Sequence, residues 1–190
     1  MSQLLIYSIG YGARDISAFI QILKKYSIDY LIDVRSKPYS SFKPEFSKKS
    51  LEQKLNENNI RYVFMGDSLG GQPEDPSCYD EAGKVDYGKC RQRPQFQSGI
   101  ERLRRAQQQQ LSVVIMCSEA KPESCHRTKL IGEALVQDGI DIQHIDESDI
   151  LLTHNQVMLR VIKGQPSLFG DDFFKHTSRK SYTRNDDESE

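Results

Sequence analysis

Short apolar strands alternate with amphipathic helices along most of this chain, and this alternation constrains the fold more than any other feature. Runs that fit buried strands lie over residues 4–9, 30–34, 60–65, 113–116 and 141–145. Strands joined through helices pair in parallel by right-handed crossovers, which place helices on both faces of the sheet. We therefore expect an α/β fold: a three-layer Rossmann-like domain with a mainly parallel sheet of about five strands.

Helix starts are marked by residues whose side chains cap a backbone N–H. Asp15 precedes apolar residues at helical spacing, and Thr153, with glutamine three residues later, opens a last helix. Ser50, also followed by glutamine at the third position, resembles a capping box. A further helix is predicted over about 125–138.

The composition divides the chain into two parts. Residues 1–162 carry the periodic pattern of one α/β domain, whereas residues 163–190 form a polar tail that we expect to be largely disordered. Within the domain, residues 72–93 contain prolines and charges without periodicity. Loops of this length are functional or mobile.

The balance of charge limits the classes of partner. The net charge is -1, from 26 basic and 27 acidic residues, so no overall field attracts nucleic acid or an anionic membrane. A local basic surface is still enough to bind nucleic acid. No apolar run approaches the roughly 20 residues that span a bilayer, so no membrane partner is expected.

Cysteine usage indicates a reducing compartment. The four cysteines are sparse, and the opening MSQLLIYSIG lacks the basic segment of a secretory signal. Both observations favour a cytoplasmic chain with free thiols.

Polar residues and glycines follow four of the predicted strands, at 10–12, 33–35, 69–71 and 117–127. The carboxyl ends of parallel strands share one edge of a sheet. These segments are therefore expected to line a single crevice, where glycines permit close backbone approach to a ligand.

Two arginines at this edge indicate an anion site. Arg127 stands in the first turn of its helix, where its charge opposes the helix dipole, and an anion shared with Arg35 and the helix N–H groups offsets that cost. The alternative is a structural bridge from Arg127 to Glu119 or Glu123. Similarly, Asp33 either pairs with Arg35 or orients a ligand hydroxyl or Arg127.

Cys117 has two interpretations. A thiol close to a helix N-terminus, to His126 or to Arg127 has a lowered pKa and becomes nucleophilic. A cysteine at the end of a strand is also often a small core residue. On the same rim, Glu119 and His126 could divide acid and base work between them.

Metal binding is the less favoured interpretation of these residues. Cys117, Cys125 and His126 are all competent zinc ligands. However, no C-x-x-C pair is present, and the adjacent Cys125 and His126 are expected to point in different directions on a helix. The sequence therefore assigns no metal, and Cys78 and Cys90 of the long loop could either complete a site or have no role.

A set of segments resembles one known family. They are 8–11, 32–35 with Pro38 and Ser40, Tyr62 with 69–71, 117–119, 125–127, and His144. Together they resemble the DUF488 family of uncharacterised bacterial and archaeal proteins. This resemblance implies an α/β domain and a pocket, but no reaction. The implied ligand-binding residues are Tyr11, Asp33, Arg35, Ser40, Gly70, Gly71, Cys125 and Arg127.

A fainter likeness is to rhodanese-type sulfurtransferases, in which a cysteine in a short anion-binding loop accepts sulfur. Here the loop after Cys117 is longer and carries Glu119 and Glu123, which would repel an anionic donor. The glutamate at position 123 also breaks the Cys-x5-Arg spacing of cysteine phosphatases.

The leading functional hypothesis is an enzyme that binds a phosphate-bearing small molecule, a nucleotide or a nucleic-acid component. Its catalytic candidates are Cys117, Glu119 and His126. One alternative is a non-catalytic module that binds nucleic acid or protein, with the cluster as a structural clasp. Another is sulfur or thiol chemistry at Cys117. The sequence assigns no cofactor and no oligomeric state.

Overall fold

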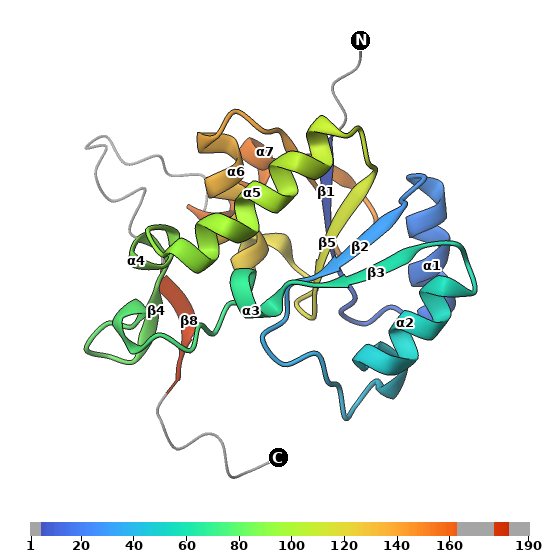
Figure 1. Cartoon of the computed structure of the whole chain (residues 1–190). Coiled ribbons are helices and arrows are strands. Elements are labelled where there is room, and N and C mark those ends of the chain that lie inside the picture. The colour runs from blue at the N-terminus through green and yellow to red at the C-terminus, as the bar shows by residue number, and fades with distance from the viewer. Residues whose placement is uncertain (1–4, 163–176, 183–190) are drawn as a thin grey trace.

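The computed structural model describes residues 5–162 and 177–182 of the chain (Figure 1). The strands are β1 (Ile6–Gly10), β2 (Tyr30–Asp33), β3 (Arg61–Phe64), β4 (Lys84–Asp86), β5 (Val113–Cys117), β6 (Ile142–Ile145), β7 (Leu151–Thr153) and β8 (Thr177–Ser181). The helices are α1 (Ile16–Lys25), α2 (Lys48–Asn56), α3 (Gly66–Leu69), α4 (Tyr87–Arg91), α5 (Pro94–Gln108), α6 (Glu133–Gln137) and α7 (His154–Val161).

The central sheet has six strands in the order β3-β2-β5-β1-β6-β7. All neighbours pair in parallel except β6 and β7, which are antiparallel. The predicted Rossmann-like architecture is confirmed, and the five expected strands form its parallel part. The sixth strand, β7, has only three residues, too few to show a period in the sequence.

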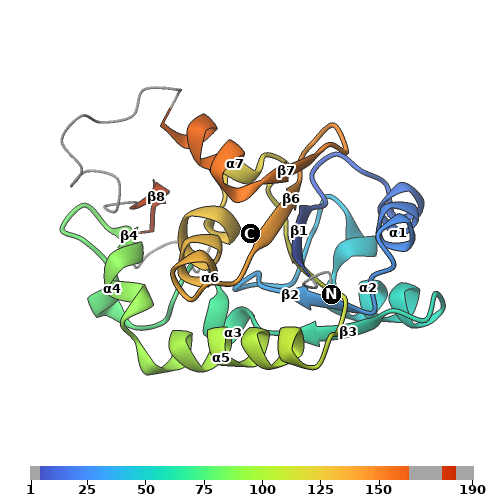
Figure 2. The same cartoon turned by 90° about the horizontal axis from the view of Figure 1, so that it is seen from above.

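Helices cover both faces of this sheet, as Figure 2 shows from above. The α1 and α2 helices pack on one face, and α3, α5 and α6 pack on the other. Because successive side chains on a strand alternate, Ile115 and Met116 of β5 belong to opposite cores. Burying a side chain such as Phe19 or Leu103 contributes about 1.5–3 kcal/mol.

Local capping fixes two helix starts as predicted. The Asp15 carboxylate accepts the N–H of Ala18 at 2.8 Å, and Thr153 forms a complete capping box with Gln156. The helix expected from Ser50 instead begins at Lys48, so that prediction was wrong. Both serines at 47 and 50 fit a cap, and the sequence does not distinguish them.

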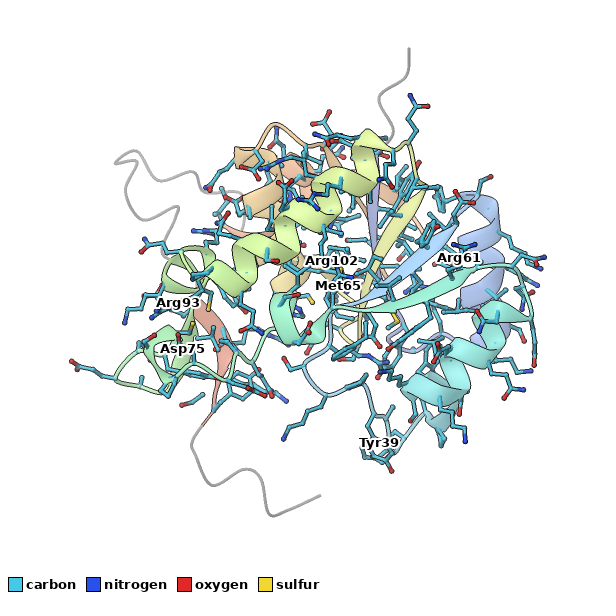
Figure 3. The ribbon with its side chains drawn as sticks, viewed as in Figure 1. Tyr39, Arg61, Met65, Asp75, Arg93 and Arg102 are labelled. Carbon is cyan, nitrogen blue, oxygen red and sulfur yellow. The ribbon has the colours of Figure 1, made fainter. Side chains whose placement is uncertain are left out.

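Residues 72–93 contain β4, α4 and a short 3₁₀ turn, Pro76–Cys78. Asp75 and Arg93, which lie close together in Figure 3, form an ion pair with 3.3 Å between the charged atoms. This contact joins the start of the segment to the N-terminal end of α5.

The β8 strand corrects the expectation of a disordered tail for residues 177–181. It pairs with β4 in an antiparallel ribbon that lies apart from the central sheet (Figure 1). The buried Ser178 hydroxyl accepts the N–H of Val85 at 2.9 Å. Such pairing depends on a distant strand, so a polar tail gives no local sign of it. The rest of the tail, 163–176 and 183–190, lies outside the described residues.

Candidate functional site

A cavity of about 290 Å³ opens at the carboxyl edge of the parallel strands. The predicted site residues that line it are Tyr11, Arg35, Gly71, Cys117, Glu119, Cys125 and His126. The remaining lining residues are Ser36, Lys37, Tyr39, Gln72, Tyr87, Ser118, Ser124, Ser178, Arg179, Lys180 and Tyr182. The predicted residues that lie outside this lining are Asp33, Ser40, Gly70 and Arg127. Segments far apart in the sequence therefore meet here, as the parallel topology predicts.

Two thiols lie side by side in the cavity wall. Cys117 ends β5, and its Sγ is 2.6 Å from Sγ of Cys125. Cys125 follows a short 3₁₀ turn and has an extended backbone, with φ -111° and ψ 150°. It therefore precedes the helical segment instead of standing on it. That segment begins as a π-helical turn, Arg127–Gly132, a geometry often found at functional sites.

The two thiols differ in acidity. Burial raises the pKa of both. At Cys125 the hydrogen bond with Cys117 and the positive charge of Arg127 outweigh burial and lower the pKa to about 7. At Cys117 burial and the neighbouring Cys125 raise the pKa well above its usual value. Near neutral pH Cys125 is therefore partly ionised, whereas Cys117 remains a thiol.

His126 is held in a single orientation. Its Nε2 lies 3.1 Å from the backbone carbonyl oxygen of Val34, which can only accept a hydrogen bond, so Nε2 carries the proton. Burial lowers the pKa of His126, which favours the neutral ring. Its unprotonated Nδ1 faces Sγ of Cys125 at 3.6 Å.

Arg127 is fully buried and does not reach the cavity. Its Nη1 donates to Sγ of Cys117 at 3.0 Å and to the backbone oxygen of Glu119 at 2.6 Å. Its Nη2 donates to the backbone oxygen of Ala120 at 3.0 Å. The guanidinium thus holds the backbone of the loop after β5. The sequence predicted instead that Arg127 binds an anion or pairs with a glutamate side chain.

Asp33 and Arg35 form the predicted pair. Arg35 donates through Nε to Oδ1 of Asp33 at 2.9 Å and through Nη2 to Oδ2 at 2.6 Å. The Tyr62 hydroxyl also donates to Oδ2, at 2.7 Å. The remaining nitrogen of Arg35, Nη1, is buried without a hydrogen-bond partner among the described residues.

The cavity rim is mainly basic, and part of it comes from β8. Arg179 forms an ion pair with Glu119 at 3.1 Å, and Lys180 follows it on the strand. Because Glu119 is paired and Glu123 lies outside the lining, the expected repulsion of anions is small. Tyr39, 73% exposed, points outward at the end of its loop (Figure 3). The sequence analysis did not include Arg179 and Lys180 in the site. Their adjacent positive charges were the feature of the sequence that could have indicated this part of the rim.

Two glycines allow close approach inside the site. A Cβ on Gly10 would collide with the carbonyl of Glu119 and the guanidinium of Arg127. A Cβ on Gly71 would lie 2.8 Å from Cγ and Nδ1 of His126. These positions need glycine because other backbone or ring atoms occupy the space of a side chain.

The predicted Ser40 and Gly70 have packing roles. The Ser40 hydroxyl accepts the N–H of Lys43 at 3.2 Å, and its N–H donates to Oγ of Ser47 at 3.1 Å, so it organises its own loop. A Cβ on Gly70 would meet the hydroxyl of Ser36 and the carbonyl of Gly66.

Cys117, Cys125 and His126 form the one group of potential metal ligands found within the described parts of the chain, with donor atoms within 4.8 Å of one another. The argument that adjacent Cys125 and His126 diverge was wrong. It assumed that both stand on a helix, whereas the extended backbone of Cys125 turns its thiol toward the imidazole.

His144, which the family resemblance includes, lies inside β6 and is a core histidine with both ring nitrogens in contact with polar partners. It is fully buried, and its Nδ1 lies 2.6 Å from Oγ of Ser8. Its Nε2 lies 3.0 Å from Nδ1 of His154, whose Nε2 contacts Glu133 at 2.8 Å. This chain of contacts lies outside the cavity lining.

The fold and the site define a class of protein: a Rossmann-like α/β domain with a thiol–imidazole cluster at the carboxyl edge of its parallel sheet. A family model described as domain of unknown function DUF488 matches residues 15–134. The chain therefore belongs to the DUF488 family, as the resemblance indicated. Comparison with curated proteins and with solved structures gave no match. In the described part of the chain, no helix has the length and apolar character needed to cross a membrane.

Proposed function

We propose that this protein is an enzyme that binds a small phosphate-bearing molecule, a nucleotide or a nucleic-acid component, and presents it to Cys117, Cys125 and His126. The observation that carries the proposal is Arg35. Its side chain is 6% exposed and lines the cavity, yet Nη1 has no partner among the described residues. A buried guanidinium nitrogen without a partner is costly, and an oxyanion in the cavity would satisfy it.

The rim supports the same class of ligand. Lys37, Arg179 and Lys180 line the cavity, and the carboxylate in the lining, Glu119, is paired with Arg179. The excess of positive charge favours an anion. Two tyrosines in the lining that are not core residues, Tyr39 and Tyr182, offer faces on which a base can stack.

The position of the cluster favours an enzyme over a non-catalytic module. The thiols, the imidazole and Arg127 are hydrogen-bonded to one another, as in a structural clasp, but a clasp alone would not need to line a cavity. Here both thiols and the imidazole belong to the cavity lining, beside the proposed anion site. A bound ligand would therefore meet groups that can bind or transfer protons, or ligate an ion.

The test is binding of AMP to the metal-free protein, measured as the rise in the melting temperature of the protein. Adenosine, which lacks the phosphate, is the uncharged control. At a concentration of about 100 times Kd, a ligand stabilises by about 2.7 kcal/mol, roughly 5 °C or more for a chain of this size. Lys180→Ser should reduce the shift severalfold, whereas Lys49→Ser, an exposed lysine of α2, should not. Equal shifts with adenosine, or none with AMP and inorganic pyrophosphate, would refute the proposal.

A further inference from the structure

Three donor atoms in the cavity wall have the identity and spacing of a metal site. The Sγ atoms of Cys117 and Cys125 and a ring nitrogen of His126 lie within 4.8 Å of one another. Zinc bond lengths of about 2.3 Å to sulfur and 2.0–2.1 Å to nitrogen place a sulfur and a nitrogen ligand roughly 3.6 Å apart in a tetrahedron. The contact between Cys125 and His126 is already 3.6 Å.

The two sulfurs are closer than an ion requires. They are 2.6 Å apart, whereas two thiolates on one tetrahedral zinc ion lie roughly 3.8 Å apart. They must separate by about 1 Å to admit an ion. Cys125 lies between a 3₁₀ turn and the π-helical turn, so it is not fixed by a strand as Cys117 is.

The surroundings of His126 provide an independent reason to expect an ion. Metal-binding histidines usually donate their second ring N–H to a carboxylate or a backbone carbonyl, which fixes the tautomer and the ring orientation. His126 has this arrangement, because Nε2 donates to the Val34 carbonyl and Nδ1 is left as the ligand atom beside the thiols.

Arg127 provides the corresponding support on the sulfur side. Its Nη1 lies 3.0 Å from Sγ of Cys117, and its backbone N–H lies 3.5 Å from Sγ of Cys125. Such hydrogen bonds stabilise the thiolate forms that metal binding requires. Two thiolates would neutralise a divalent ion, and Arg127 would leave the site with a net positive charge that suits an anionic ligand.

We propose that Cys117, Cys125 and His126 bind a Zn²⁺ ion whose fourth coordination position faces the cavity. Three protein ligands with one open position are typical of catalytic zinc sites, and the Cys₂His set is among the known ones. The position of the open site rests on the proposed function, since the anion held by Arg35 would lie beside the ion. There the ion would polarise a phosphoryl oxygen or activate a bound water.

The chain contains a matched control. Cys78 and Cys90 are a second pair of buried, neighbouring thiols, but no described histidine joins them in a group of potential metal ligands. If two buried thiols were sufficient, both pairs would bind the ion. If the imidazole is required, binding should depend on Cys117, Cys125 and His126 alone.

The experiment is titration of the reduced, metal-free full-length protein with Co²⁺ without oxygen, with zinc binding confirmed by competition. The expected result is one equivalent of cobalt with visible bands of tetrahedral geometry and thiolate-to-cobalt charge transfer in the near ultraviolet. Cys125→Ser and His126→Gln should each lower the affinity for cobalt by more than about 100-fold. Substitution of residues that only hydrogen-bond to metal ligands costs roughly 10- to 100-fold. The double variant Cys78→Ser/Cys90→Ser should bind cobalt like the wild type.

Absence of these bands in the folded wild-type protein would overturn the proposal, whatever the variants do. Bands that survive in Cys125→Ser, or disappear in the Cys78→Ser/Cys90→Ser control while it remains folded, would overturn the assignment of ligands. A Cys117–Cys125 disulfide in the isolated protein, with no cobalt binding after reduction, would identify a redox pair instead. The cobalt titration contains no AMP and the AMP assay contains no metal, so either proposal can fail alone.

A final addition of AMP to the cobalt protein tests the open position. The cobalt bands should shift as an oxygen ligand enters. If AMP raises the melting temperature without changing the bands, the ion is closed off from the cavity and the open position is refuted.

Discussion

Glu119 and Arg179 are 60 residues apart in the sequence, yet their charged atoms lie 3.1 Å apart at the rim of the cavity. The pair connects the loop that follows Cys117 to β8 of the C-terminal tail. It therefore brings tail residues, Lys180 among them, to a site whose thiols and imidazole come from the central sheet.

Replacing Arg179 should show whether this ion pair contributes to the stability of the fold or to anion binding. Both side chains are substantially exposed, so Arg179→Ser should change the free energy of unfolding by less than about 1 kcal/mol. The cavity would lose a cation and leave Glu119 unpaired, so AMP affinity should fall severalfold and become less dependent on salt. Calorimetric titrations at two salt concentrations would measure this. An unchanged affinity would place the anion away from β8.

Arg127→Met should destabilise the protein strongly. The change removes donors from the carbonyls of Glu119 and Ala120, which Arg127 holds inside the protein. We expect a loss of about 3 kcal/mol in urea denaturation, because buried acceptors without partners cost about 1–3 kcal/mol each. Arg102→Met, at an exposed arginine of α5, should stay within about 0.5 kcal/mol. Similar losses in both variants would contradict the structural role of Arg127.

Tyr62→Phe tests the support of the Asp33–Arg35 pair. It removes the hydroxyl that donates to Oδ2 of Asp33 at 2.7 Å but keeps the ring. The expected cost is about 1–2 kcal/mol in urea denaturation, since a hydrogen bond to a buried carboxylate is stronger than average. Tyr26→Phe is the control, because its ring contact with Tyr7 does not depend on the hydroxyl. A cost no larger than the control's would show that Arg35 alone satisfies Asp33.

The pH dependence of stability should reflect His144. Burial, and next the charge of His154, lower its pKa well below the usual value, so the native state excludes a proton that the unfolded chain binds. The stabilisation is complete above the unfolded pKa of about 6.5 and is lost as the pH falls below it, at up to about 1.4 kcal/mol per pH unit. Urea denaturation between pH 7 and pH 5 should show this slope, and His144→Gln should reduce it to the part contributed by His126, whose pKa is also lowered by burial. Equal slopes in the two proteins would assign the acid sensitivity to other groups.

The order of elements could be predicted because it is encoded locally. Apolar runs such as 113–116 and caps such as Asp15 act over a few residues, and parallel pairing follows from the alternation of strands and helices. The strands β7 and β8 could not be predicted in this way. The β7 strand has three residues and the β8 strand, TSRKS, is polar throughout, and each is stabilised by a partner strand that the local sequence does not specify.

The candidate site could be predicted by residue but not by role. The sequence indicates that Cys117, Cys125 and His126 meet at one edge, because strand ends and helix starts meet there. It does not indicate that Cys125 leaves the helix, which decides whether its thiol faces the imidazole. It also does not show that Arg127 donates its hydrogen bonds to backbone carbonyls of the loop, because these contacts depend on how the side chain packs.

Gly71→Ala tests the position of the imidazole without changing any proposed ligand. The new Cβ would lie 2.8 Å from Nδ1 of His126, closer than real Cβ contacts, so the ring must shift, which disturbs its hydrogen bond to the Val34 carbonyl. We expect cobalt affinity to fall at least about tenfold and stability to fall by about 1–3 kcal/mol. Gly88→Ala, in α4, meets only Oδ1 of Asp86 at 3.1 Å and should leave cobalt binding unchanged. If Gly71→Ala binds cobalt as tightly as the wild type, the imidazole is not a ligand, and the thiols would then have to hold the ion with a donor from elsewhere.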